Sequence, residues 1–334
     1  AANCIPTVGS MQGAFASFMI CGHTNKEKDT VLFIDPGFPV HKFQTKILGL
    51  KMESFDIYEY RGEKLREKLE SIFSTGKIHS VLYSNPNNPT WVCLTDEELK
   101  IIGELANKYD VIILEDLAYF GMDFRKDYSH PGVAPFQPTV GKYTDNYILM
   151  LSTSKAFSYA GERCAVLGIS NKLAERRYPD LKEFCGQEIF ARGIIFGALH
   201  PLSSGTSHSA QYAVAGVMKA VNDGTYNYRD DVLEYGEKAK MMKDAFTSNG
   251  FKFTYDEDLG EPIADGFYFT YYYPGFTGAE LLEKMLYYGI SAISLDTCGS
   301  TRQGIRACTS LIKRDEIPVL AERLKRFAED HPIK

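Results

Sequence analysis

The sequence predicts an α/β protein with a mainly parallel sheet and crossover helices, followed by a smaller C-terminal α+β domain. Short apolar runs typical of buried strands alternate with helical patterns through the first two-thirds of the chain. Polar side chains follow two of these runs, at the position where open α/β sheets bind ligands. After a long helix expected at 231–249, the pattern changes to strands at 251–255 and 267–273. We therefore expect a large domain at 1–225 and a small domain at 226–334.

The first elements of the large domain are expected to be one helix and four strands. The apolar run at 14–20 is too short to span a bilayer, and no lysine or arginine precedes it, so an early helix is favoured over a membrane segment. The strands are expected at 31–34, 81–83, 111–114 and 147–151.

A capping box marks the start of one crossover helix. Thr95 can accept a hydrogen bond from the backbone of Glu98, whose side chain can reach back to the backbone of Thr95. The apolar residues that follow share one helical face, and they are Leu99, Ile102, Ala106 and Tyr109. This helix would connect the strands at 81–83 and 111–114, so the polar residues after those strands would lie side by side.

The remaining segments are a loop and the elements of the small domain. Three prolines and little periodicity predict a long connecting surface loop at 125–146. The helix at 231–249 is stopped by Gly250, and further helices are expected at 277–288 and 314–329.

Composition restricts the class of protein. A chain of 334 residues can bury one large core or two domains, and 44% hydrophobic with 24% charged residues is ordinary for a soluble globular protein. The net charge of −6 argues against a nucleic-acid surface, because no excess of basic residues would attract phosphates.

Cysteine and histidine usage argues against disulfides and metal sites. The seven cysteines are odd in number and form no paired spacing, which fits a reducing compartment, so a cytoplasmic location is expected. The sequence contains no Cys-x-x-Cys or His-x-x-x-His pattern, so we expect no metal.

The most informative local pattern surrounds Lys155, which ends an apolar strand and precedes a turn of small residues that leads to Gly161 and Arg163. A lysine amine condenses with an aldehyde, and burial beside other cations lowers its pKa. The hydroxyls of Ser152 and Ser154 and the guanidinium of Arg163 can bind a phosphate dianion. The pattern therefore indicates a site for pyridoxal phosphate (PLP), although Ser-x-Ser-Lys by itself is usually a surface turn.

Two further strings strengthen this interpretation. Asn88 follows the strand at 81–83, and Asp116 and Tyr119 follow the strand at 111–114. The PLP ring needs an anion opposite its nitrogen to keep that nitrogen protonated, and Asp116 can supply one. The phenolic oxygen of the ring needs hydrogen-bond donors, which Asn88 and Tyr119 can supply.

Together these strings resemble the class I/II aminotransferases of PLP fold type I. The family's Asn-Pro-Thr stretch matches 88–90, its Asp-x-Ala-Tyr stretch matches 116–119, and its Ser-x-Ser-Lys with a downstream Gly-x-Arg matches 152–163. The resemblance spans nearly the whole chain, and several motifs in the right order are far more specific than one.

The resemblance implies further site residues. The family's phosphate-binding turn reads Gly-Ser-x-Gln, and here it begins with Gly9, Ser10 and Met11. The aromatic residue stacked on the cofactor would be Phe38, which follows Pro36-Gly37. The arginine that binds the substrate α-carboxylate would be Arg306, near the C-terminus.

The resemblance also implies the activity and the assembly. It implies an aminotransferase that moves an amino group between an amino acid and a 2-oxo acid, with the cofactor held on Lys155 as a Schiff base and with Asp116 and Tyr119 as the other catalytic residues. It further implies a homodimer whose active sites lie at the interface. A PLP-dependent lyase or decarboxylase of the same fold stays open as an alternative. A non-catalytic PLP-binding regulatory domain also stays open, although the acidic net charge disfavours it.

The sequence departs from the family pattern in three places. The residue after Asn-Pro-Thr is usually glycine and here is Trp91, the single tryptophan of the chain. The family's Arg-x-Gly is found as Arg163-Cys164-Ala165. Residues 1–8 precede Gly9, where family members carry an N-terminal arm and part of the small domain, so we expect that arm to be missing from this chain.

Overall fold

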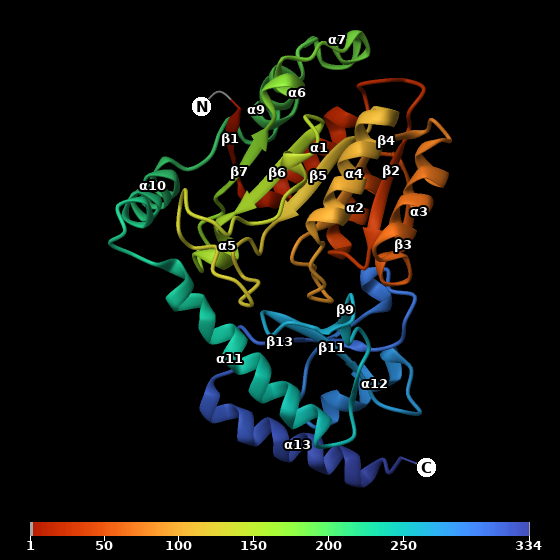
Figure 1. The fold of residues 1–334 in the computed structure, drawn as a ribbon, viewed down its shortest axis with the longest axis vertical. Helices are drawn as coiled ribbons and strands as arrows, with labels where there is room; N and C mark the ends of the chain where they lie inside the picture. The colour runs from red at the N-terminus through yellow and green to blue at the C-terminus, as the bar shows by residue number, and fades with distance from the viewer. Residues whose placement is uncertain (1–2, 334) are drawn as a thin grey trace.

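The computed structural model describes residues 3–333 and has a large layered part with a smaller part beneath it (Figure 1). A seven-stranded sheet in the order β1-β7-β6-β5-β4-β2-β3 forms the centre of the large part. Its strands are β1 (Cys4–Thr7), β2 (Thr30–Asp35), β3 (Lys51–Asp56), β4 (Ile78–Ser84), β5 (Ile112–Leu117), β6 (Tyr147–Ser152) and β7 (Ala165–Ile169).

The pairing of these strands confirms the mainly parallel sheet. Strands β2 to β6 pair in parallel, whereas β7 pairs antiparallel with both β6 and β1. Parallel neighbours need crossover connections, and helices supply them here. Strands β2, β4 and β5 are buried along their whole length, as expected for a sheet covered on both faces.

Two helical layers cover the sheet. One face packs against α1, α6, α8 and the π-helical η3, and the other packs against α3 and α4. The helical segments of the large part are α1 (Gly9–Cys21), α2 (Pro39–Ile47), η1 (Ile57–Tyr60), α3 (Glu63–Phe73), α4 (Asp96–Tyr109), η2 (Val140–Lys142), α5 (Thr153–Ala156), α6 (Asn171–Glu175), α7 (Pro179–Cys185), α8 (Phe190–Arg192), η3 (Gly193–Leu199), α9 (His200–Ser203) and α10 (His208–Asn222).

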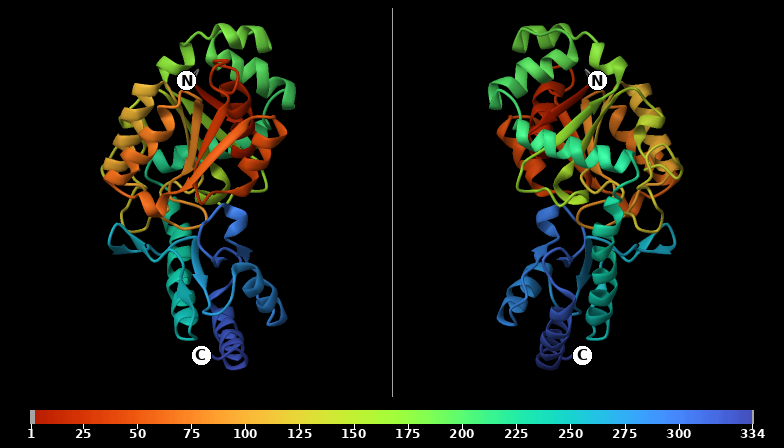
Figure 2. Two further views of the ribbon diagram at one scale, coloured as in Figure 1. Left: turned by 90° about the vertical axis from the view of Figure 1, so that its right-hand side faces the viewer. Right: turned by 90° about the vertical axis from the view of Figure 1, so that its left-hand side faces the viewer.

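The smaller part is the expected α+β unit. Its antiparallel sheet has the order β12-β13-β11-β8, and a short hairpin, β9 with β10, lies beside it. The long helix α11 runs alongside this part and reaches the large one (Figure 2). The elements are α11 (Tyr228–Thr247), β8 (Lys252–Phe253), β9 (Glu257–Asp258), β10 (Glu261–Pro262), β11 (Tyr268–Tyr272), α12 (Gly278–Tyr287), β12 (Ile293–Ser294), η4 (Asp296–Cys298), β13 (Ile305–Cys308), η5 (Arg314–Glu316) and α13 (Ile317–Asp330). The division of the chain after residue 225 stays a prediction.

The expected elements are found, with shifts at their ends. All four strands predicted for the large part are present, and each is longer than predicted or shifted by a residue. The strand expected at 251–255 is reduced to the two residues of β8. Strands β1, β3 and β7 were not predicted. Strand β3 lies at the sheet edge with four exposed residues in a row, so it lacks the apolar run that identifies a buried strand.

The capping box of α4 is confirmed. Thr95 Oγ1 accepts a hydrogen bond from the backbone N–H of Glu98 at 3.2 Å, and Glu98 Oε2 accepts from the backbone N–H of Thr95 at 3.0 Å. The helix ends at Asp110, which adopts the left-handed conformation with φ 51°. Between residues 3 and 333, no helix combines the length and the apolarity needed to cross a membrane.

Two helical glycines should respond in opposite ways to alanine. Alanine is the better helix former by about 1 kcal/mol. A Cβ at Gly103, within α4, would lie 2.7 Å from Cβ of Tyr143 and 3.1 Å from its carbonyl carbon, so a well-packed helix would have to shift. We expect Gly103→Ala to lower the free energy of unfolding by about 1–3 kcal/mol, as overpacking does.

The control is Gly216 within α10, where a Cβ would meet no atom within 4 Å. Gly216→Ala should raise the free energy of unfolding by about 0.5–1 kcal/mol. Urea unfolding of both variants measures the difference. Two changes of the same sign would contradict the packing described for α4.

Candidate active site

Several residues predicted from the sequence lie at or just after the ends of neighbouring strands of the large sheet. Asn88 follows β4, Asp116 lies near the end of β5, and Lys155 lies in the short helix that follows β6. Because neighbouring parallel strands end at one edge of the sheet, these three side chains converge. Arg306 reaches the same place from β13 of the smaller part.

Lys155 is half-buried in an apolar and cationic environment. Its Nζ lies 5.0 Å from the ring centroid of Phe267, which directly precedes β11. Burial is the largest cause that lowers the pKa of Lys155, and the positive charges of Arg306 and Arg163 lower it further. A larger fraction of the amine is therefore unprotonated and able to react than in an exposed lysine.

The guanidinium of Arg163 lies directly against Gly9. A Cβ at Gly9 would be only 2.2 Å from Nη2 of Arg163, and Gly9 has φ +72°, which disfavours other residues. Arg163 is itself left-handed, with φ 53°, and its Nη1 donates to the carbonyl of Ala160 at 2.7 Å. Gly9 begins helix α1, so backbone N–H groups and a guanidinium meet at one point, as anion sites require.

The other residues of the predicted phosphate site lie in the first turns of two helices. Ser10 and Met11 follow Gly9 in the first turn of α1. The buried Ser152 ends β6, and its Oγ accepts a hydrogen bond from the backbone N–H of Ser154 at 3.2 Å. The hydroxyls of Ser152 and Ser154 therefore lie on the segment that also contains Lys155.

Asp116 is buried and faces His41, a residue that was not predicted to belong to the site. Its Oδ1 accepts a hydrogen bond from the backbone N–H of Ala118 at 3.1 Å. Its Oδ2 lies 3.5 Å from Nε2 of the buried His41. Among the described residues, that nitrogen has no hydrogen-bond partner. Phe38 caps α2 and packs edge-on to His41 at 5.6 Å, and all three side chains line one cavity.

Arg306 and Asn88 join the two parts of the molecule. Nη1 of Arg306 donates to Oδ1 of Asn88 at 2.8 Å. The guanidinium carbon of Arg306 lies 4.1 Å from the ring centroid of Tyr268. This cation–π contact favours one orientation of the planar guanidinium. Within the described residues, Nε of Arg306 is buried and has no hydrogen-bond partner. A buried donor without a partner is costly, so a ligand that accepts from it would be favoured.

Tyr119 belongs to an aromatic cluster between the two parts. Its hydroxyl is 2.8 Å from the hydroxyl of Tyr268, and its ring packs against Trp91 and Phe267. Burial, followed by the nearby Tyr268 hydroxyl, raises the pKa of Tyr119 well above its ordinary value. The phenol therefore keeps its proton and remains a hydrogen-bond donor.

Two residues of this site were missed for different reasons. His41 lies one helical turn after Phe38 on α2, so a search for titratable residues on the same helical face could have found it. Tyr268 lies in an apolar strand among other aromatic residues, where nothing in the sequence distinguishes it from core packing.

Comparisons with known proteins show the family of this chain. The family model for aminotransferase class I and II matches residues 1–324. The glutamate-pyruvate aminotransferase AlaC of Escherichia coli is 28% identical over 237 residues, which cover 70% of this chain and 52% of that protein. A probable aspartate aminotransferase of Methanocaldococcus jannaschii is 28% identical, over 51% of this chain and 42% of that protein. A cystathionine beta-lyase of Corynebacterium glutamicum is 25% identical, over 52% of this chain and 44% of that protein. The chain thus spans about half the length of these relatives.

Solved structures share the fold. An aminotransferase from Mycobacterium tuberculosis superposes with a TM-score of 0.76 at 17% identity, over 99% of this chain and 77% of that one. An aspartate aminotransferase from Thermotoga maritima gives 0.73 at 17% identity, over 98% of this chain and 76% of that one. With a family model that matches nearly every residue, the chain belongs to the class I and II aminotransferases.

Proposed function

We propose that this protein is a PLP-dependent aminotransferase that moves an amino group between an amino acid and a 2-oxo acid. One observation carries the proposal. The chain supplies an amine with a lowered pKa, Lys155, near a fixed guanidinium, Arg306, together with a buried carboxylate, Asp116, at the end of the neighbouring strand. These are the groups that a cofactor aldehyde, a substrate carboxylate and the ring nitrogen of the cofactor require.

Members of this family use PLP, and the residues present here fit it. The contact between Gly9 and Arg163 leaves no space for a Cβ, which suits an anion held by backbone N–H groups and a guanidinium. Asp116 offers a buried carboxylate at the end of β5, and Lys155 offers an amine with a lowered pKa. PLP, when bound, supplies an electron sink for negative charge at the substrate α-carbon.

The residues of the chain divide into two sets toward the cofactor. Those that would hold its phosphate lie at the start of α1 and around β6, and they are Gly9, Ser10, Met11, Ser152, Ser154 and Arg163. Those that would contact its ring or aldehyde lie at the carboxyl edge of the sheet, and they are Phe38, Asn88, Asp116, Tyr119 and Lys155.

In this proposal Lys155 moves the reacting proton. Its amine is unprotonated more often than that of an exposed lysine, because burial and the charges of Arg306 and Arg163 disfavour the ammonium form. It can therefore accept the α-proton of a bound amino acid as general base and return a proton as general acid. The nearby Phe267 ring excludes water from one side of this amine.

Arg306 orients the substrate in this proposal. Its guanidinium is fixed by Asn88 and by the ring of Tyr268. A carboxylate can accept two parallel hydrogen bonds from such a fork, and this geometry fixes the direction of the α C–H bond. The buried Nε of Arg306 has no partner among the described residues, so a carboxylate would satisfy it.

A second candidate function is a PLP-dependent lyase, favoured by the likeness to the Corynebacterium glutamicum cystathionine beta-lyase. Both activities begin with removal of the α-proton, and they differ in what leaves afterwards. A panel of amino acids assayed with 2-oxoglutarate separates them. Formation of a new keto acid with glutamate supports amino transfer, whereas release of ammonia or carbon dioxide supports the lyase or decarboxylase reading.

We also propose a homodimer in a reducing compartment such as the cytoplasm. Large apolar side chains are exposed on the segment that follows α8, where Phe196 is 51% and Tyr212 is 78% exposed, as at an interface. Gln12 in the phosphate-site helix donates to Ser203 of this segment at 2.7 Å, so an interface there would adjoin the site. All seven cysteines are free thiols, which supports a reducing environment.

The first functional prediction concerns Lys155. Borohydride reduction of the PLP-loaded protein should attach a pyridoxyl group to Lys155, as peptide mapping would reveal. Lys155→Ala should lower turnover by roughly 10⁴-fold or more, because the base and the tether are lost together. The matched control is Lys243, whose pKa is also lowered by burial but which pairs with Asp265 in the smaller part. Labelling of Lys243, or unchanged labelling in Lys155→Ala, would refute the assignment.

The second prediction concerns substrate binding by Arg306. Arg306→Lys should lower kcat/KM for amino acids by roughly 10²-fold, because an ammonium cannot reproduce the planar fork. Amines that lack a carboxylate should change by less than a few-fold. Steady-state kinetics with matched pairs of amino acid and amine measures this ratio. Equal losses for both substrate types would indicate a structural role instead.

The third prediction concerns the close contact of Gly9 with Arg163. Gly9→Ala should weaken PLP retention by at least tenfold, because its Cβ must displace the guanidinium. The matched control is Gly62→Ala, where φ is also positive, at +62°, but a Cβ would meet no atom within 4 Å. That variant should lose about 1–3 kcal/mol of stability through backbone strain and retain PLP. Absorbance of bound PLP during dialysis tests both, and full retention in Gly9→Ala would exclude Gly9 from the phosphate site.

A further inference from the structure

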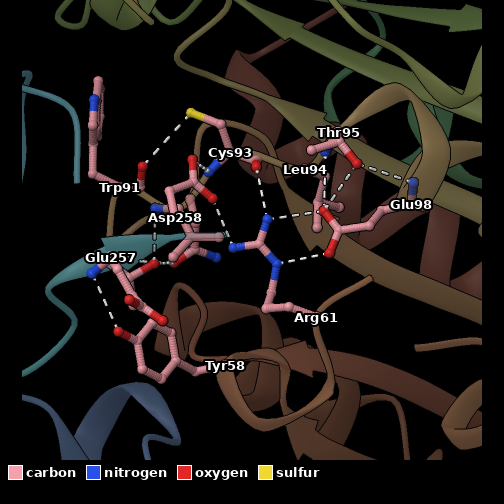
Figure 3. A network of polar contacts seen from close by, with 12 residues as sticks. Tyr58, Arg61, Trp91, Cys93, Leu94, Thr95, Glu98, Glu257 and Asp258 are labelled. Atoms are coloured by element: carbon pink, nitrogen blue, oxygen red, sulfur yellow. Dashed lines mark hydrogen bonds and ion pairs between the residues drawn. The ribbon is translucent and has the colours of Figure 1, made fainter. Parts of the chain in front are cut away.

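The loop at 85–94, between β4 and α4, contacts the smaller part at three closely spaced residues. Asn88 accepts a hydrogen bond from Arg306, Trp91 packs against Gly266, and the backbone of Cys93 donates to Asp258. The loop therefore runs from the substrate end of the site to the hairpin of β9 and β10. Figure 3 shows the end of this path around Asp258.

Asp258 fixes both backbone groups of Cys93, one directly and one through an arginine. Oδ2 of Asp258 accepts from the N–H of Cys93 at 3.2 Å, and Oδ1 accepts from Nη1 of Arg61 at 2.7 Å. Nη2 of the same arginine donates to the carbonyl of Cys93 at 3.1 Å. Arg61 also binds Glu98 through Nε at 2.7 Å (Figure 3). The loop is thereby held between the smaller part and helix α4.

The central charges of this cluster are buried and each has a partner of opposite sign, so they do not readily rearrange. The side chains of Arg61, Glu98 and Asp258 are at most 8% exposed. Burial disfavours charged Arg61, but its contacts with Glu98 and Asp258 outweigh burial and raise its pKa. Burial would raise the pKa of Glu98, and Arg61 lowers it below the ordinary value. Arg125 adds a second cation 3.1 Å from Asp258, and removing one partner from such a cluster leaves a buried charge unpaired.

Trp91 occupies the middle of the junction and links its two ends. It is fully buried with φ 66°, and a Cβ at Gly266 would lie 2.1 Å from its Cε2. Its ring packs edge-on to Tyr119 at 5.5 Å and to Tyr268 at 6.2 Å. The guanidinium of Arg306 lies over the ring of Tyr268, so the indole of Trp91 packs against the residue that positions this arginine.

Internal hydrogen bonds make the loop stiff enough to couple these contacts. The backbone N–H of Asn87 donates to Val92 at 2.9 Å, and the N–H of Trp91 donates back to Asn87 at 2.9 Å. Thr90 donates its hydroxyl to Oδ1 of Asn87 at 2.8 Å. A shift at Cys93 must therefore move the turn that contains Asn88.

We propose that Asp258 is a positioning residue: it holds the loop at 85–94 against the smaller part so that Asn88 and Trp91 keep Arg306 in place to receive a carboxylate. The consequence for substrate rests on the proposed aminotransfer. The claim that Asp258 holds the loop in place does not depend on aminotransfer. Trp91 is the single tryptophan of the chain, so its fluorescence reports the environment of the loop directly.

The test compares Asp258→Ala with wild type in the PLP-loaded protein. Trp91 emission should shift to the red and acrylamide quenching should rise several-fold, because the indole loses its buried position. KM for an amino acid donor should rise about tenfold more than KM for the corresponding amine, and PLP retention should be unchanged. Asp258→Asn keeps an acceptor for the N–H of Cys93, so the change in Trp91 fluorescence and the selective rise in KM should both be smaller than in Asp258→Ala. The same measurements on Asp258→Asn test the proposal if Asp258→Ala does not fold.

The control is Glu59→Ala, which removes another ion pair between the two parts, Glu59 with Arg302 at 2.5 Å, without touching the loop. It should leave the Trp91 spectrum and the ratio of the two KM values unchanged. Unaltered Trp91 emission in both Asp258 variants, an equal rise in KM for amino acid and amine, or the same shift in Glu59→Ala would each overturn the proposal. A wild-type protein that binds PLP but transfers no amino group would instead refute the proposed function, with the Trp91 criterion still deciding whether Asp258 positions the loop.

Discussion

Parallel pairing of β4, β5 and β6 is the constraint on which the candidate site depends. Parallel neighbours end at one edge of the sheet, so residues that follow three separate strands meet there. Asn88, Asp116 and Lys155 are far apart in the sequence, and this pairing brings them together. The backbone N–H of Asn85 also donates to the carbonyl of Asp116 at 3.1 Å, which fixes the spacing between the first two chain segments.

The electrostatics of the site come from both parts of the molecule. The large part supplies the carboxylate of Asp116 and the cation of Arg163, and the smaller part supplies Arg306. The ammonium form of Lys155, which lies beside the ring of Phe267, is disfavoured first by burial and then by the positive charges of Arg306 and Arg163. The lowered pKa of Lys155 therefore depends on residues of both parts, so the contacts that hold the two parts together bear on the proposed chemistry.

Sequence patterns predicted the interior of the molecule better than its junction. Long apolar runs and the capping box at Thr95 depend on neighbours in the chain, so the central strands and α4 were predicted. Strand β3 is polar and lies at the sheet edge, so its pairing with β2 could not be inferred from apolar periodicity. The site motifs were visible because each is a short string. Tyr268 and Asp258 act through contacts with distant segments, and no local spacing marks them.

The pair of Trp91 and Gly266 illustrates this limit and suggests how the junction is built. The resemblance to the family made Trp91 a departure in a turn where glycine is usual, and the sequence offered no reason for it. In the structure the indole fills the space that a side chain at position 266 would need, so a large residue on one part is matched by a missing side chain on the other. Packing of this kind tolerates little displacement, because a close-packed interior responds to changes as small as one methylene. Two residues after Trp91, the backbone of Cys93 binds the buried carboxylate of Asp258. The loop that contains Asn88 is thus positioned by packing and by buried charges, and Arg306 donates a hydrogen bond to Asn88 itself.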